Sequence, residues 1–220
     1  MTRSTTPRPR AAADGPTQPD GSPWPVPPPG GYRLDDLLRL DLPARAELID
    51  GSLVLPFPQQ EFHAVTTDLL LYALREAAPG GLRARRQTAV VLSEHTAPVP
   101  DVIVVRTDGT GDDGDTDSTG GTDGAERRSY PADGVALAVE VVSPDSRERD
   151  RETKPFKYAR ARIPHYWRVE MSGPDNLPVV HTYVLDVLTF GYVPTGVHRD
   201  RLRVDVPFPV TVDLTEIERM

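Results

Sequence analysis

The sequence predicts an α/β or α+β domain in which a mixed central sheet is flanked by helices. Two observations indicate this class. Short apolar strands come before, between and after two amphipathic helical segments, which is the order of a sheet covered by helices. The chain has 220 residues, a length that suits one domain with attached tails better than two domains.

Two segments are expected to lie outside the folded core. Residues 1–30 carry nine of the 24 prolines, so we expect a disordered, Pro-rich N-terminal arm. Residues 108–124 contain six aspartates, no basic residue and no apolar residue, so we expect a disordered acidic insert. The folded domain is therefore expected over residues 31–220, with this insert inside it.

Composition excludes several classes of protein. The formal net charge is −8, but the acidic insert carries −6 of it, so the remainder is near neutral and a nucleic-acid partner stays open. The chain has no cysteine, which excludes a disulfide framework and a thiolate metal site. No apolar run is long enough for a bilayer and no signal peptide is visible. We therefore expect a cytoplasmic protein without a membrane partner.

The clearest helix is expected over residues 61–78, and Pro79-Gly80-Gly81 ends it. Its expected core face comprises Phe62, Val65, Leu69, Tyr72 and Ala73.

An Asp50-Gly51 turn predicts a hairpin between residues 46–50 and 52–55. The other expected elements are short helices over 32–40 and 150–162, and strands over 82–92, 99–105, 135–142, 165–170, 179–185 and 188–193.

Two carboxylates interrupt apolar strands. Asp101 precedes the run Val102–Val105, and Glu140 lies near the end of the strand over 135–142. A buried carboxylate is unfavourable unless it is paired or binds a metal. Either acid alone is more simply a core carboxylate bound to arginine. Together, on adjacent strands, they would meet at one point, where a hard divalent cation relieves their repulsion.

The distribution of lysine strengthens this interpretation. Of 25 basic residues, only Lys154 and Lys157 are lysines, and both fall on the helix that follows Glu140. They are three residues apart and so share one helix face. A compact ammonium can approach a phosphate as a point charge or orient a water molecule. Without the nearby acids, two ordinary surface lysines would be the simpler interpretation.

The chain contains the motifs Pro100-Asp101, Glu140-Val-Val-Ser143-Pro144, Asp150-Arg-Glu-Thr-Lys154, Tyr158 and Ile163-Pro-His-Tyr166-Trp167. These motifs resemble those of the Uma-two restriction endonuclease family, which belongs to the PD-(D/E)XK nuclease superfamily. The resemblance extends over about residues 32–217 and implies a restriction-endonuclease-like core. It also implies a Mg²⁺- or Mn²⁺-dependent endonuclease that hydrolyses phosphodiester bonds of DNA.

The resemblance implies roles for individual residues. Asp101 and Glu140 match the metal ligands, which would act with a backbone carbonyl near Val141. Lys154 matches the catalytic lysine, which this family takes from the following helix. Glu47 matches an acid that binds the metal or its water. His63, by the same match, and Lys157, by its place beside Lys154, are accessory candidates.

DNA is the expected partner, and a homodimer is left open. Arginines near the expected site are candidates for phosphate contact, although each alone is more simply a solvated surface charge. These candidates are Arg83, Arg85, Arg86, Arg147, Arg149 and Arg151.

Three features depart from the family pattern. Arg162 replaces the small residue expected before Ile163-Pro164. The other two concern Pro155 and the acidic insert. Pro155 directly follows Lys154 and would displace it if the helix began elsewhere. The acidic insert lies between the two acid-bearing strands and would repel nucleic acid near the site. Both favour a rival interpretation, a catalytically inactive nuclease fold that serves as a binding module in a defence or mobile-element system. A sugar hydrolase using two carboxylates ranks lower, because two tryptophans offer few stacking surfaces.

Overall fold

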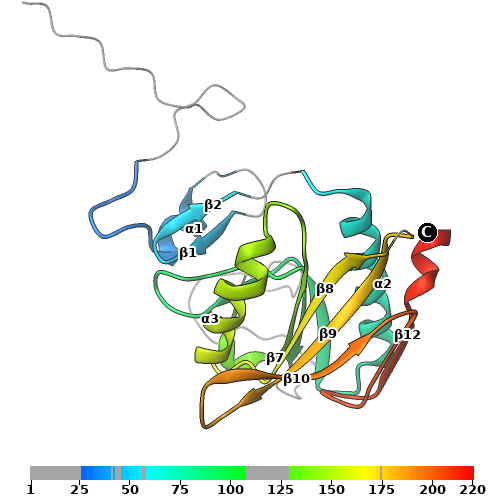
Figure 1. The fold of residues 1–220 in the computed structure, drawn as a ribbon. Coiled ribbons are helices and arrows are strands. Elements are labelled where there is room, and N and C mark those ends of the chain that lie inside the picture. Colours follow the sequence, from blue (N-terminus) through cyan, green and yellow to red (C-terminus); the bar gives the residue numbers. More distant parts are fainter. Residues whose placement is uncertain (1–25, 41, 43–45, 56–57, 108–128, 174) are drawn as a thin grey trace, which may run out of the picture.

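The computed structural model describes residues 26–40, 42, 46–55, 58–107, 129–173 and 175–220. A six-stranded mixed sheet runs through the molecule, with helix α2 on one face and helix α3 on the other (Figure 1). This is the flanked mixed sheet that the sequence predicts. Residues 1–25 of the expected arm and the whole acidic insert lie outside the described residues.

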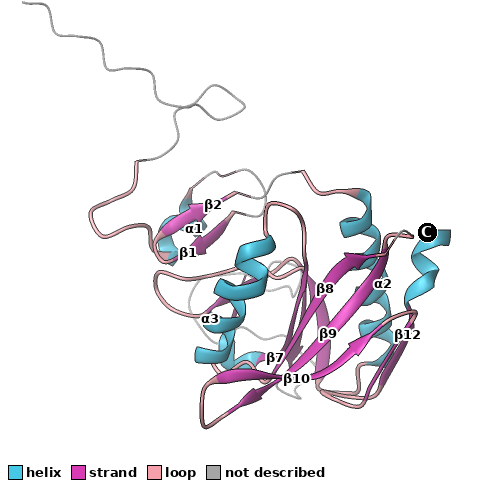
Figure 2. Ribbon diagram, in the orientation of Figure 1, coloured by secondary structure: helices cyan, strands magenta, loops and turns pink. Residues whose placement is uncertain are grey.

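Helices and strands follow one another in the expected order (Figure 2). The helices are α1 (Leu34–Arg39), α2 (Glu61–Ala77) and α3 (Lys154–Arg160), with short helical turns η1 (Ala132–Gly134), η2 (Arg149–Thr153) and η3 (Leu214–Arg219). The strands are β1 (Glu47–Ile49), β2 (Ser52–Val54), β3 (Leu82–Arg86), β4 (Ala89–Val91), β5 (Val102–Arg106), β6 (Ser129–Pro131), β7 (Val135–Val141), β8 (His165–Ser172), β9 (Leu177–Asp186), β10 (Gly191–His198), β11 (Arg201–Val204) and β12 (Val210–Asp213).

The order of the central sheet is β10-β9-β8-β7-β5-β3. Only β7 and β8 are parallel neighbours in it, and the other neighbouring pairs are antiparallel. A parallel pair needs a crossover, which η2 and α3 supply. The crossover leaves the sheet at the C-terminal end of β7, so the residues after Glu140 and the first turn of α3 lie close together.

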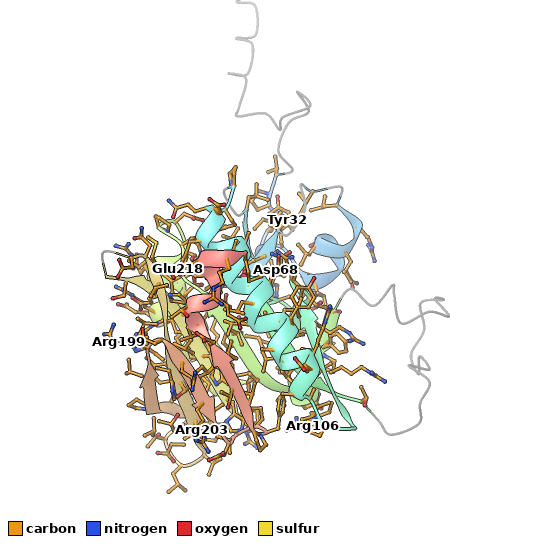
Figure 3. The ribbon with its side chains drawn as sticks, turned by 90° about the vertical axis from the view of Figure 1, so that its right-hand side faces the viewer. Tyr32, Asp68, Arg106, Arg199, Arg203 and Glu218 are labelled. Atoms are coloured by element: carbon orange, nitrogen blue, oxygen red, sulfur yellow. The ribbon has the colours of Figure 1, made fainter. Side chains whose placement is uncertain are left out.

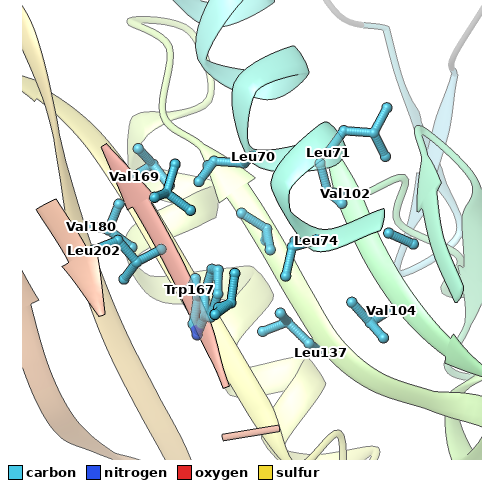
Figure 4. Packing of buried hydrophobic residues seen from close by; sticks show 14 of the residues in the cluster. Leu70, Leu71, Leu74, Val102, Val104, Leu137, Trp167, Val169, Val180 and Leu202 are labelled. Atoms are coloured by element: carbon cyan, nitrogen blue, oxygen red, sulfur yellow. The ribbon is translucent and has the colours of Figure 1, made fainter. Parts of the chain in front are cut away.

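Hydrophobic residues fill both faces of the sheet. On one face, Leu70 and Leu74 of α2 pack with Leu137 and Trp167 of the sheet (Figure 4). Strands β11 and β12 and turn η3 close this side, and their Leu202 joins the same cluster. On the other face, a second cluster includes the buried aromatic rings of Tyr158 from α3 and Tyr166 from β8.

The predicted Asp-Gly hairpin joins β1 to β2. Asp50 has φ 48° and Gly51 has φ 75°, the left-handed pair that a tight two-residue hairpin requires. The backbone of Gly31 approaches this turn so closely that a Cβ on Gly31 would lie 2.9 Å from the Gly51 oxygen. Tyr32 N donates to the same oxygen at 2.8 Å. These contacts fix the small unit that carries Glu47.

Two of the expected strands differ from the structure. The chain expected as a strand over 188–193 is a turn up to Phe190, and β10 begins at Gly191. The strand expected over 82–92 is two strands, because Gln87 adopts φ 48° and turns the chain. Strand β3 stays in the central sheet, whereas β4 pairs with β6 in a separate one.

The buried face of α2 also differs from the expected one. Tyr72 is 61% exposed, while Leu70, Leu71 and Leu74 are buried. The helix is covered by the sheet on one side and by β12 and η3 on another, so its buried surface is broader than one stripe. None of the helices in the described part of the chain has the length and hydropathy needed to cross a membrane.

Candidate active site

A pocket opens where the C-terminal end of β7, the start of α2, the β1–β2 hairpin and the crossover meet. These elements meet because β7 lies in the middle of the central sheet and the crossover that contains α3 leaves the sheet at the end of β7. Its polar lining includes Glu47, Gln59, His63, Gln87, Asp101, Glu140, Ser143, Asp145, Ser146, Arg149, Asp150 and Lys154.

Lys154 occupies the centre of the buried part of this site. Its Nζ lies 2.9 Å from Glu47 Oε1, 3.1 Å from Glu140 Oε2 and 3.2 Å from Asp150 Oδ1. The side chain is only 5% exposed. Burial alone lowers the pKa of a lysine, but the carboxylates of Glu140, Glu47 and Asp150 raise the pKa of Lys154 well above its ordinary value. Lys154 is therefore an ammonium at neutral pH.

Glu140 has a hydrogen-bond donor on each carboxylate oxygen. Lys154 Nζ donates to Oε2, and the hydroxyl of Tyr158 donates to Oε1 at 2.5 Å. Tyr158 is fully buried one turn further along α3. Burial raises the pKa of Glu140 well above its ordinary value, and the ammonium of Lys154 opposes that rise. The donors on both oxygens fix the orientation of this carboxylate.

Asp101 lies just before β5 and faces the same pocket. The antiparallel pairing of β5 with β7 places it beside Val141, whose N–H donates to Asp101 Oδ2 at 2.8 Å. His63 Nε2 lies 3.1 Å from Asp101 Oδ1. The position of His63 in the first turn of α2 directs its buried imidazole at the carboxylate. The expected accessory residue thus contacts an expected metal ligand.

Glu47 reaches the site from β1. Its Oε1 accepts a hydrogen bond from Val99 N at 2.9 Å and also lies against Lys154 Nζ. Glu47 therefore links the hairpin unit to the chain segment before Asp101 and to the crossover helix.

Asp150 and Tyr158 contact the Lys154–Glu140 pair directly, although the sequence analysis gave neither residue a role. Asp150 is 1% exposed, and its Oδ1 has no hydrogen bond, only the ion pair with Lys154. Burial raises the pKa of Asp150 above its ordinary value. The available signal was its spacing, because an acid four residues before a lysine on a helix can pair with it.

The other sequence candidates divide into two groups. Arg149 lines the pocket, whereas Arg83, Arg85, Arg86, Arg147 and Arg151 do not. Lys157 is directed away from the pocket, because its Nζ pairs with Asp50 Oδ1 at 2.6 Å.

The donor set suits a hard divalent cation in its chemistry. Five carboxylates, one ammonium and one guanidinium line the pocket, so negative charge is in excess, and oxygen is the ligand that Mg²⁺ prefers. Among the described residues, however, no three His, Asp or Glu side chains are arranged to hold a metal ion. The ammonium of Lys154 lies between three of the carboxylates. A cation here would therefore have at most two side-chain ligands, and main-chain or water oxygens would supply the others.

The fold and the pocket define a nuclease-like α+β domain. The sequence model of the family Uma2, described as "Putative restriction endonuclease", matches residues 34–215. The chain belongs to this family, which confirms the resemblance found in its motifs.

One solved structure gives independent support for the fold. A putative nuclease belonging to DUF820 from Anabaena variabilis superposes with a TM-score of 0.56, at 16% identity, over 80% of this chain and 89% of that chain. At 16% identity, this similarity is evidence for the fold alone. A comparison with curated proteins found no match.

Proposed function

We propose that this protein is a metal-dependent endonuclease that hydrolyses phosphodiester bonds of DNA. The observation that carries the proposal is the meeting of Asp101, Glu140 and Lys154 in one pocket at the end of β7. Membership of the Uma2 family supports a nuclease-like function. Cleavage of DNA, use of Mg²⁺ or Mn²⁺, and a cytoplasmic location belong to the proposal.

In this proposal Asp101 and Glu140 would hold the cation together with the carbonyl of Val141. When bound, Mg²⁺ or Mn²⁺ would polarise a phosphoryl oxygen and lower the pKa of a water molecule. Glu47 stays a proposed ligand of the metal or its water, although its Oε1 already contacts Lys154 and Val99 N.

Lys154 contributes positive charge and does not act as a base. Three carboxylates keep it protonated, so it has no free electron pair with which to accept a proton. Its ammonium stabilises the negative charge that develops on the phosphoryl group. Glu47 and Asp150 position Lys154, Tyr158 positions Glu140, and His63 positions Asp101.

A second candidate is an inactive nuclease fold that binds nucleic acid or a partner protein. The position of Lys154 favours it, because the ammonium fills the space between three carboxylates and replaces part of the charge that a cation would supply. The two candidates differ in metal binding and in cleavage.

The deciding experiment incubates plasmid and single-stranded DNA with the protein in Mg²⁺, Mn²⁺ or EDTA. We expect cleavage with either metal and none in EDTA, and no cleavage by Asp101→Ala. Calorimetry should show Mn²⁺ binding by the wild type and its loss in Asp101→Ala. If the wild type binds DNA without cutting it in either metal, the inactive module is the better description.

A further inference from the structure

We propose that the uncovered face of β8 and β9 beside Glu140 binds the phosphate backbone of the DNA strand that enters the site. This surface consists of Arg151, Arg168, Glu170, His181 and Arg199, and we call it the arginine surface. Arg199 belongs to it because it follows the end of β10, the strand whose Val197 pairs with His181. The inference rests on the proposed function for the choice of DNA as the ligand. The inference adds a binding surface to the proposed site. Of the arginines that the sequence analysis gave as phosphate contacts, this surface contains only Arg151.

The surface begins one strand away from Glu140. The parallel register pairs Glu140 with Arg168, and the antiparallel register pairs Arg168 with His181. Directly paired residues project from the same face of a sheet, and neighbouring strands are about 4.8 Å apart. Glu140, Arg168 and His181 therefore form a row that leads sideways from the pocket.

Solvent reaches this part of the sheet. Tyr166, two residues before Arg168 on the same face, is covered by the cluster that contains Tyr158 of α3. In Figure 1, α3 lies to the left of β8 and β9, and no helix passes in front of these two strands. The side chain of Arg168 is partly exposed, and Arg151 and Arg199 are exposed. A ligand strand could thus lie on the sheet beside the start of the crossover.

Two of the three guanidinium groups, those of Arg151 and Arg168, are held in place before any ligand arrives. Glu170 Oε1 lies 3.1 Å from Arg151 Nε and 2.8 Å from Arg168 Nε, and Arg151 Nη2 contacts the other oxygen. The Arg168 guanidinium also lies over the ring of Tyr183, 5.7 Å from its centre. Side chains ordered in this way lose less entropy when they bind a phosphate.

The surface keeps surplus positive charge. Three arginines face one glutamate, which leaves two uncompensated charges, and Arg199 forms no ion pair with another described residue. Burial and the charge of Arg168 lower the pKa of His181, so its imidazole is neutral at pH 7. A structural ion pair would need only one arginine. Two further cations beside a phosphodiester-cleaving site match the charge of a nucleic-acid backbone.

The test measures binding of a labelled DNA duplex in EDTA, by fluorescence anisotropy at several salt concentrations. Arg168→Ala and Arg199→Ala should each weaken binding several-fold. Each should also reduce the slope of log K against log salt by about 0.9, the value for one lost phosphate contact. Arg203→Ala is the matched control, because Arg203 is an exposed arginine on β11 that is not part of the arginine surface. It lies at the opposite end of the molecule from Tyr32, which packs beside the β1–β2 hairpin at the pocket (Figure 3).

Several outcomes would overturn the inference. Unchanged affinity and salt slope in Arg199→Ala, an exposed position where folding is not at risk, would show that the surface does not bind DNA. If Arg168→Ala and Arg199→Ala lost binding to polyglutamate but kept their affinity for DNA, the surface would be assigned to acidic polypeptides. Wild-type protein that binds DNA through this surface but never cuts it would refute the proposed activity and leave the surface supported.

Discussion

At the residue scale, Lys154 holds the site together as well as serving the proposed reaction. Three carboxylates from three different elements, β1, β7 and η2, converge on its ammonium. Removing one member of a buried ion network leaves the others without compensation. The lysine is therefore both a candidate for catalysis and a structural centre, and its substitution should affect both properties.

Lys154→Ala should abolish cleavage and also lower the free energy of unfolding. We expect a loss of about 3–5 kcal/mol, the usual penalty for an uncompensated buried charge. In scanning fluorimetry the variant should melt well below the wild type in EDTA. Mn²⁺ should restore part of the difference, because a cation can replace the lost ammonium. A melting temperature equal to that of the wild type in EDTA would contradict the buried network.

Tyr158→Phe tests the hydrogen bond that orients Glu140. The substitution keeps the ring and removes only the hydroxyl, so a buried carboxylate oxygen loses its donor at a cost of about 1–3 kcal/mol. We expect a lower melting temperature and a reduced single-turnover cleavage rate. Tyr192→Phe is the control. The Tyr192 hydroxyl donates to Ile163 O over a distance of 2.8 Å, and neither residue lines the pocket. This control should lower stability modestly and leave the cleavage rate unchanged. Equal cleavage by both variants would show that Glu140 needs no donor.

The sequence predicted part of this site and missed the rest for a physical reason. Asp101 and Glu140 stood out because they interrupt apolar strands, and the structure brings both to the pocket with Lys154. Their catalytic and metal-binding roles stay predictions. Asp150 lies in a run of alternating acids and arginines, where composition does not indicate which acid is buried. Its burial depends on how the crossover folds back onto the sheet.

At the element scale, the crossover helix shows how local geometry places a functional residue. Pro155 falls in the first turn of α3, where the missing N–H breaks no helical hydrogen bond. The preceding segment η2 forms a π-helical turn, with Lys154 N bonded to Arg149 O. Lys154 consequently still points at Glu140. The sequence predicted a helix here, but neither this turn nor its effect on Lys154 follows from periodicity.

Lys157→Ala should be much milder than Lys154→Ala. Lys157 joins α3 to the β1–β2 turn through Asp50, whose side chain is 70% exposed. Exposed ion pairs contribute about 0–1 kcal/mol. We expect a melting temperature within a few degrees of the wild type and nearly unchanged single-turnover cleavage at saturating Mg²⁺. A dead Lys157→Ala with an active Lys154→Ala would reverse the roles of the two lysines.

The strands illustrate what periodicity can and cannot predict. β5 and β7 are central and buried on both faces, so their apolar runs identified them with nearly the right bounds. The segment over 82–92 looked continuous, yet the backbone at Gln87 divides it between two sheets. Side-chain pattern reports burial, whereas the choice of sheet depends on a single backbone conformation that the side chains do not specify.

At the scale of the whole molecule, charge is distributed very unevenly along the chain. Residues 108–124 carry six aspartates, and the remaining sequence is close to neutral with 25 basic residues. The insert begins two residues after β5, and Arg106 anchors that end by donating to Asp133 O at 2.9 Å. The fold next to the insert thus has its own contacts, which do not require the acidic residues.

Removal of residues 108–124 is expected to leave the fold intact and to raise affinity for DNA. Six negative charges would be lost, and their long-range repulsion of phosphate is strongest at low salt. Replacing the same six aspartates with asparagine separates charge from length and should raise affinity equally. The measurements are the melting temperature and the DNA dissociation constant at low and at high salt. If the deletion variant melts far below wild type while the asparagine variant does not, the segment contributes to the fold through its chain and not through its charge. If neither variant binds DNA more tightly at low salt, the acidic residues lie too far from the binding surface to influence it.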